Sequence, residues 1–227
     1  MNSEEFRKAV KYATNSPILR GRDIKRYIYD WADVWLINTH NGIKGRLERI
    51  HIEDYPAVKA HLDQFWDKIK DRADQGDTPY NLRNCAYLED FYKPKLVWAE
   101  LSRTGNSFAI DTSKILLGNT GYILTVPSNN IKELGYIMAF MNSRIVLYQL
   151  DRLTTRFDDN GWRWLRQFVE EIKIPKFSDN PQISGIALEA SKSNQEDISE
   201  QLNNIISSIL GLNEQELSYI NDSLKGY

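Results

Sequence analysis

The sequence of 227 residues has little that forms covalent or metal crosslinks. Cys85 is its single cysteine, which excludes an intrachain disulfide and a zinc site built on cysteines. No run of about 18 apolar residues occurs, so no transmembrane helix is expected. The polar start, Met1 to Phe6, lacks the pattern of a signal peptide. We therefore expect an intracellular protein that resides in the cytoplasm and has no membrane partner.

Motifs that carry chemistry are also scarce. There is no Gly-x-Gly-x-x-Gly, no phosphate-binding Gly-Lys-Ser/Thr loop and no Gly-x-Ser-x-Gly elbow. The three histidines, His40, His51 and His61, include no His-x-x-x-His pair for a metal. The Asn/Asp-Pro-Pro-aromatic motif, with which amino-methylating enzymes clamp a flipped base, is absent as well. We expect no catalytic residue, metal site or cofactor site in this chain.

One short pattern keeps a Mg²⁺-dependent nuclease open as an alternative. Asp158 or Asp159 is followed by Glu171-Ile172-Lys173, an acid…Glu-x-Lys arrangement that can hold Mg²⁺ and position a water. A polar turn followed by a helix end would contain the same residues, and so short a pattern often matches by chance.

The chain does have the composition of a globular domain, with 41% hydrophobic and 26% charged residues. Its 6 tryptophans and 12 tyrosines are amphipathic rings suited to a surface that grips a partner. The net charge of −2 is unevenly distributed: of 31 acidic and 29 basic residues, eight acids but two bases follow residue 177. The first part of the chain is therefore net +4 and the tail net −6, so a mildly basic body precedes an acidic tail.

Hydrophobic spacing predicts a mixed α/β (α+β) fold, in which an irregular mixed sheet with flanking helices precedes a C-terminal helical segment. We assign residues 1–177 to one domain and 178–227 to a helical tail. Helices are expected over 2–12, 56–73 and 131–148, briefly from Trp162, and in the tail over 198–209 and from an Asn213/Glu216 capping box. Strand-like or extended segments are 18–29, 34–37, 95–101, 107–110, 115–117, 122–126 and 172–175, and Asn41-Gly42 predicts a turn.

The tail has more than one interpretation. Its helices either fold back on the body or form an arm that packs on another domain or subunit. A protein-interaction adaptor, with the acidic tail as its binding surface, is a further alternative.

Three clusters of basic, aromatic and amide side chains favour a nucleic-acid partner. The first is residues 20–27, the second surrounds the Asn160-Gly161 turn with Arg152, Arg156, Trp162, Arg163 and Arg166, and the third is the loop of residues 78–84. Arginine reads guanine edges, asparagine reads adenine, and lysine and other arginines contact phosphates. Any one cluster is more often a solvated surface, but three of them in a net-positive body make DNA or RNA binding a serious alternative. In the first cluster, Gly21 lets a backbone approach closely. The candidate DNA-binding residues are Arg20, Arg22, Lys25, Arg26, Tyr80, Asn81, Arg83, Arg103, Arg152, Arg156, Trp162 and Arg163.

Several stretches, in order, resemble the TaqI-like C-terminal specificity domain. This is the target-recognition domain of type IIG restriction–modification enzymes and related adenine-N6 DNA methyltransferases. The stretches span almost the whole chain: residues 18–24, Arg26-Tyr27, 35–37, 55–62, Arg72, 78–80, 91–98, 121–123, 141–143 and 172–175.

The resemblance implies a bacterial DNA-recognition domain that reads bases of double-stranded DNA. It also implies that a separate domain or subunit, absent from this chain, binds S-adenosylmethionine and methylates adenine. A fused nuclease, which would use Mg²⁺, occurs in some such enzymes. The stripe from Ile198 to Ile209 is similar to the spacer and docking helices of related specificity subunits.

Overall fold

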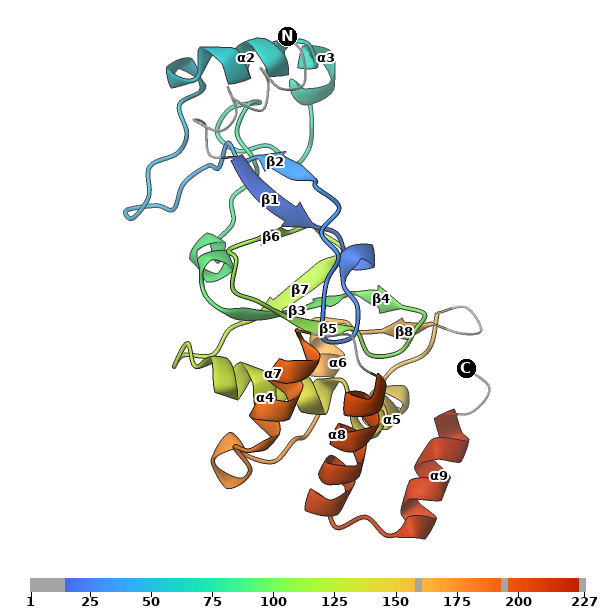
Figure 1. Cartoon of the computed structure of the whole chain (residues 1–227). Helices are drawn as coiled ribbons and strands as arrows, with labels where there is room; N and C mark the ends of the chain where they lie inside the picture. Colours follow the sequence, from blue (N-terminus) through green and yellow to red (C-terminus); the bar gives the residue numbers. More distant parts are fainter. Residues whose placement is uncertain (1–14, 158–160, 193–195, 225–227) are drawn as a thin grey trace. The chain divides into compact units, whose positions relative to one another are not determined.

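A computed structural model describes residues 15–157, 161–192 and 196–224 (Figure 1). The helix expected over residues 2–12 and the aspartates Asp158 and Asp159 lie outside the described residues. The fold is α+β, as predicted, with small sheets and C-terminal helices. Described residues up to Ile18 and Asp33–Asp90 form one compact unit, and Leu19–Ala32 with the residues from Phe91 onward form a second.

The first unit has a small core beside a strand pair. Strand β1 (Asn15–Leu19) pairs antiparallel with β2 (Trp35–Ile37), so that Asn15 faces Ile37 and Pro17 faces Trp35. The 3-10 helix η2 (Ile52–Asp54) precedes α2 (Pro56–Asp63) and α3 (Trp66–Ile69), and η3 (Leu88–Tyr92) follows. The buried side chains of this core are Ile52 and Val58, surrounded by Ile37, Tyr55, Leu62 and Tyr80.

The single helix predicted over residues 56–73 is wrong. Pro56 does begin α2, as expected for a residue with a fixed φ and no N–H. The helix is then interrupted at Phe65, whose φ of −111° and ψ of 16° are not helical. Phe65 and Trp66, which lie at this break, are 41% and 40% exposed, and Val58 is the buried residue of the predicted stripe.

A short hairpin lies between β2 and η2, in the long loop that Figure 1 draws there. The backbone N of Ile43 donates to Leu47 O at 2.8 Å, and the N of Leu47 donates to Ile43 O at 2.9 Å. Gly42 precedes the hairpin with a φ of +73°, and a Cβ there would lie 2.4 Å from Leu47 O. A glycine is therefore required at the turn predicted from Asn41-Gly42.

The second unit is built on an antiparallel sheet in which β3 (Lys95–Ala99) lies between β5 (Phe108–Asp111) and β7 (Gly121–Leu124). Trp98 of β3 faces Phe108 and Tyr122 in the register. Its ring stacks on both at centroid distances of 5.4 and 5.5 Å. Such cross-strand aromatic pairs fix the register. The shorter strands are β4 (Leu101–Ser102), β6 (Leu116–Leu117) and β8 (Trp162–Arg163).

Two further expectations for this unit were wrong. Trp162 does not begin a helix: it pairs with Ser102 in the β4–β8 ladder, and α6 (Arg166–Val169) starts later. The strand expected over residues 18–29 ends at Leu19, because the 3-10 turn η1 (Gly21–Asp23) follows it. The extended segment 172–175 forms no strand.

Five of the described helices lie on one side of this sheet (Figure 1), and α4 packs directly on it. They are α4 (Ile131–Met141), α5 (Arg144–Leu153), α7 (Ile183–Ala190), α8 (Glu196–Ile209) and α9 (Glu214–Leu224), with the 3-10 turn η4 (Phe177–Asp179) before α7. Helix α4 packs on β3 and β5, α7 packs on α4, α8 packs on α7 and α5, and α9 packs on α5. Within the described residues, the tail helices thus fold back on the second unit. Among all the helices that the structure describes, none has the length and apolar composition of a membrane span.

The tail helices match the sequence prediction closely, whereas α7 was not foreseen. Of the predicted stripe, Leu202 is buried in the large core of the unit, and Ile198, Ile205 and Ile209 pack against that core partly buried. Ile206, which was not part of the predicted stripe, is fully buried there. The expected capping box is confirmed: Asn213 N donates to Glu216 Oε2 at 2.9 Å, and Glu216 N donates to Asn213 Oδ1 at 3.0 Å.

The single helix expected over residues 131–148 is two helices, because a buried amide network ends the first. The side chain of Asn142 accepts from Phe108 N at 3.1 Å and donates to Phe108 O at 2.9 Å. Asn106 Nδ2 donates to the carbonyls of Met141 and Ser143 at 2.6 and 3.0 Å. Ser143 then caps α5. Hydrogen bonds to β5 and its preceding loop therefore stabilise the break.

A fully buried ion pair joins β3 to β5. Lys95 Nζ contacts the Asp111 carboxylate and donates to Phe91 O at 2.7 Å, and both charged side chains have 0% exposure. The same carboxylate accepts from Tyr29 OH at 2.9 Å and from Ser113 Oγ at 2.6 Å. These partners offset the desolvation of a buried charge.

We expect Lys95→Met to lower the free energy of unfolding by about 3–5 kcal/mol, because it leaves the buried Asp111 carboxylate without a counter-charge. The double variant Lys95→Met/Asp111→Leu should regain most of this loss, since it buries no charge. Urea unfolding followed by tryptophan fluorescence measures both. A single variant as stable as the parent would show that the pair does not support the sheet.

Acid should weaken the fold through the same carboxylate. Burial by itself would raise the pKa of Asp111, but hydrogen bonds from Lys95 and Ser113 outweigh it and hold the pKa below its usual value. The unfolded chain therefore binds this proton first, and stability is lost as the pH falls from about 4 through the folded pKa. The Asp111→Asn variant should have a lower free energy of unfolding than the parent at about pH 7. Between about pH 5 and 3, however, its free energy of unfolding should fall less than that of the parent. Urea titrations across this range test it, and a variant as acid-sensitive as the parent contradicts it.

Candidate nucleic-acid interface

The first predicted cluster lies in a loop of residues 20–29 that follows β1. Its 3-10 turn η1 is held by Arg20, whose Nε and Nη2 donate to the two oxygens of Asp23 at 2.9 and 2.8 Å. The hydrogen bond from Arg20 holds the pKa of Asp23 below its usual value. Because the guanidinium is occupied by this carboxylate, Arg20 shapes the loop.

Gly21 brings the loop close to the chain's own backbone. Its N–H donates to Thr120 Oγ1 at 3.1 Å, and a Cβ on Gly21 would lie 2.6 Å from Thr120 O. The sequence analysis predicted that a backbone could approach Gly21 closely. In the structure, that backbone is the chain's own, at Thr120.

Tyr27 fixes the far end of the loop. It is buried, adopts a φ of +68° and donates its backbone N–H to Phe108 O at 2.9 Å. Burial raises the pKa of its hydroxyl. The preceding residues, Lys25 and Arg26, lie at the loop's turn, where Lys25 pairs with Asp30 and Arg26 Nη1 donates to Ser199 Oγ at 3.3 Å.

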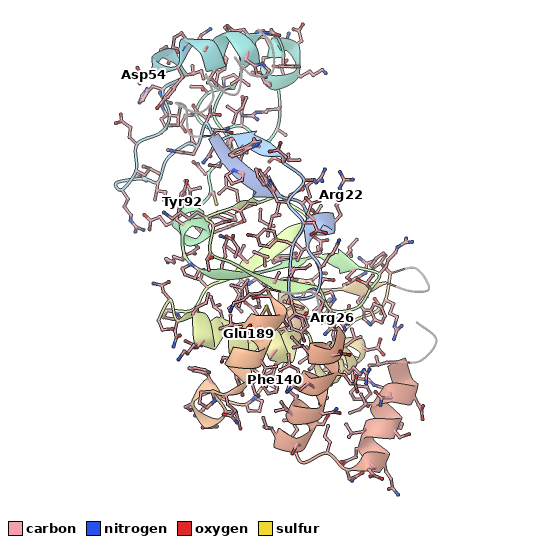
Figure 2. The ribbon with its side chains drawn as sticks, in the orientation of Figure 1. Arg22, Arg26, Asp54, Tyr92, Phe140 and Glu189 are labelled. Carbon is pink, nitrogen blue, oxygen red and sulfur yellow. The ribbon has the colours of Figure 1, made fainter. Side chains whose placement is uncertain are left out.

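The loop lines an open depression of about 830 Å³ in the second unit. Figure 2 labels Arg22 on the η1 turn and Arg26 farther along the loop. Arg22 is exposed and makes no hydrogen bond or ion pair to another described residue. Four cations and two carboxylates line the depression with polar side chains; the charged residues are Arg22, Lys25, Arg26, Arg144, Asp197 and Glu200.

The second cluster surrounds the β4–β8 ladder. The guanidinium groups of Arg103 and Arg163 lie over the ring of Phe157 at 5.9 and 5.7 Å from its centroid. Arg156 lies 4.7 Å from the centroid of Trp162, which is itself buried. Stacking on rings orients the guanidinium planes and leaves their edges for hydrogen bonds.

Two arginines of this cluster have partners nearby. Arg156 Nη2 pairs with Asp151 at 2.7 Å, and both side chains are mostly buried. Arg152 is exposed and lies over Tyr148 at 4.9 Å. Arg103 and Arg152 therefore present charge at the surface and Arg163 is half-buried, whereas Arg156 and Trp162 hold the ladder in place.

The third cluster belongs to the first unit. Tyr80 donates its hydroxyl to Asp63 Oδ1 at 2.5 Å and packs on Trp66 at 5.4 Å. That hydrogen bond to Asp63 raises the pKa of Tyr80. Arg83 is exposed and pairs with Asp74 at 3.1 Å.

Asn81 differs from its neighbours, because it is buried and its amide is occupied. Its Nδ2 donates to Ile50 O at 2.9 Å, and its Oδ1 accepts from Thr78 Oγ1 at 2.7 Å. A side chain held in this way supports the loop and presents no free edge to a base.

Two basic features of these surfaces were not predicted from the sequence. Arg144 lines the depression and pairs with Glu200 at 2.8 Å. The other feature is the basic hairpin at Ile43–Leu47, which the spacing of Gly42 and Gly45 could have indicated.

The nuclease alternative stays a prediction. Glu171 and Lys173 are exposed, and the backbone N and O of Lys173 bond to the amide of Gln149 at 3.0 and 3.1 Å. The two aspartates of the pattern lie outside the described residues. Among the residues that the structure does describe, no group of three His, Cys, Asp or Glu could hold a metal ion.

Comparison with protein families decides the kind of protein. The model of the TaqI-like C-terminal specificity domain matches residues 16–174, more than two thirds of the chain. The chain belongs to this family. A specificity domain of this family binds DNA and gives sequence selectivity to a catalytic partner. No curated protein matches the chain as a relative. The family match ends before α7, and the division of the chain at residue 177 stays a prediction.

Gly21→Ala tests the packing of the loop. The added Cβ would meet Thr120 O at 2.6 Å, so the backbone must shift. We expect a loss of about 1–3 kcal/mol in the free energy of unfolding. Gly185→Ala in α7 is the matched control, because its Cβ meets nothing within 4 Å. That variant should be neutral or stabilised by about 0.4–1 kcal/mol. Equal effects of the two substitutions in urea unfolding would contradict the assigned packing.

Proposed function

We propose that the chain selects the DNA target of an adenine-N6 methyltransferase in a bacterial restriction–modification system of the type IIG kind. The methylating domain, outside this chain, would bind S-adenosylmethionine, and any nuclease domain of the same enzyme would use Mg²⁺. The observation that carries the proposal is the basic loop of residues 20–29, found in a chain of the TaqI-like specificity family.

The loop has the chemistry needed for duplex DNA. Arg22, Lys25 and Arg26 lie along one depression with the hydroxyl of Thr104. Cations of this kind contact phosphates, and arginine can also bind the edge of guanine with two hydrogen bonds. Exposed Arg103 and half-buried Arg163, whose guanidinium groups lie over Phe157, add a second group of positive charge in the same unit.

The tail helices would serve the catalytic partner. Leu202 and Ile206 bury one side of α8 in the large core, which leaves its polar side and much of α9 toward solvent. Tyr219 of α9 is 59% exposed, a large aromatic of the type that anchors protein interfaces. We propose that the exposed side of α9, with Tyr219, docks on the methyltransferase domain or subunit.

DNA binding by the full chain tests the proposal. Fluorescence anisotropy against several duplexes should show a preference for some sequences, and affinity should fall steeply with salt. Arg22→Gln should lower the slope of log K against log salt by about 0.9, the value of one phosphate contact, without changing the unfolding midpoint.

The matched control is Lys192→Gln, which removes an exposed cation that pairs with Glu189 at 2.7 Å on α7 and its C-terminal end. It should leave both the slope and the preference unchanged. Equal and negligible binding to all duplexes, at low salt and with a methyltransferase partner present, would overturn the proposed function.

A further inference from the structure

The hairpin of the first unit is an ordered, exposed and basic element. Residues 44–48 are all exposed, although the Ile43–Leu47 bridge holds them in one conformation. Gly45 at the tip has a φ of +75°, and a Cβ added to it would meet nothing within 4 Å. The segment 41–50 contains Lys44, Arg46 and Arg49 against one acid, Glu48, which gives it a net charge of +2.

The base of the hairpin is held by the loop of residues 78–84. Asn81 donates to Ile50 O at 2.9 Å on one side of the base, and Leu82 N donates to Thr39 O at 2.8 Å on the other. The amide of Asn41 bonds to Asp77 and to Asn84 at 2.9 and 2.7 Å. A buried amide and three further bonds thus fix the base, so the tip is held out in a defined direction from this unit.

The tip has groups for each kind of DNA contact. Lys44 has no ion-pair partner among the described residues, as a phosphate ligand requires. Arg46 pairs with Glu89 at 2.6 Å, but both side chains are largely exposed, and an exposed pair of this type is readily exchanged for another anion. Leu47 is 42% exposed beside these cations, and an aliphatic side chain can contact the methyl group of thymine.

The size of the element fits the same ligand. The major groove of B-DNA is about 12 Å wide and admits a two-stranded β-ribbon. The tip at residues 43–47 is closed by one isolated bridge, so it is no wider than such a ribbon. An open depression of about 610 Å³ runs along the hairpin, lined by Lys44, Arg49, Asp77 and Asn84 among others. It leaves room for a sugar–phosphate strand beside an inserted tip.

We infer that residues 43–47 form a DNA-reading hairpin that enters a groove of the duplex. Lys44 contacts a phosphate, Arg46 and Leu47 contact base edges, and Asn81 acts as a positioning residue from inside the loop that holds the hairpin. This inference rests on the proposed function, and it adds an element that determines sequence preference.

Selection from a randomised duplex library, followed by sequencing, tests the inference with the full chain. The parent should give a consensus. Arg46→Gln should flatten the preference at one or two adjacent base pairs, with an affinity loss on the order of tenfold for the preferred sequence. Lys44→Gln should weaken all sequences alike and reduce the salt slope by about 0.9.

Lys68→Gln/Lys70→Gln is the matched control, because it removes two exposed lysines of the first unit from α3 and its C-terminal end. It should keep the consensus. Asn81→Ala should alter the same base pairs as Arg46→Gln while the protein remains folded by circular dichroism. Should Asn81→Ala unfold, Arg46→Gln alone decides the inference.

The outcomes separate the two proposals. If the unsubstituted protein shows no sequence preference, both the proposed function and this inference are wrong. A selective parent whose consensus is unchanged by Arg46→Gln, or changed equally by the α3 control, overturns the hairpin inference and leaves the proposed function standing.

Discussion

The Asp111 carboxylate is the point on which the second unit depends. It lies at 0% exposure at the end of β5 and binds Lys95 of β3, Tyr29 of the basic loop and Ser113 of the following turn. A buried carboxylate is costly unless each oxygen is hydrogen-bonded. The sheet, the turn and the loop must therefore be in place together. This makes the position of the proposed DNA-binding loop a consequence of the core, and not of loop contacts alone.

Asparagine side chains perform a related task at three places. Asn142 bonds to both backbone groups of Phe108, Asn106 accommodates the carbonyls at the end of α4, and Asn81 supports the base of the hairpin. In each case a side-chain amide satisfies backbone groups that regular secondary structure leaves unpaired. Two of these amides specify a break between helices, and one specifies a loop.

These amides explain where the sequence was informative and where it was not. Local patterns succeeded for the tail: the stripe around Leu202 and the capping box of Asn213 depend on residues within one or two turns. Periodicity failed at Asn142, since apolar spacing continues through a break that is stabilised by Phe108, distant in the sequence. It failed again at Trp162, whose strand partner is Ser102.

The candidate site shows the same limit. The basic loop could be predicted from composition, because a cluster of basic residues in a short segment can be read directly from the sequence. It could not separate Arg22, which faces solvent, from Arg20, which is bound to Asp23. Nor could it show that Asn81 lies inside while Lys44 and Arg46 lie outside. Burial depends on tertiary contacts, and those come from residues far apart in the chain.

The path of the chain through its two units has a consequence for how specificity changes during evolution. The first unit takes residues up to Ile18 and then Asp33–Asp90, and the second takes the segment between them and all that follows. The basic loop is thus encoded inside the stretch that builds the other unit. A single recombination event near residue 90 would exchange the hairpin and the loop together, whereas a double crossover confined to residues 33–90 would replace the hairpin alone. Such a domain can inherit one of the two proposed DNA-reading elements while it acquires another.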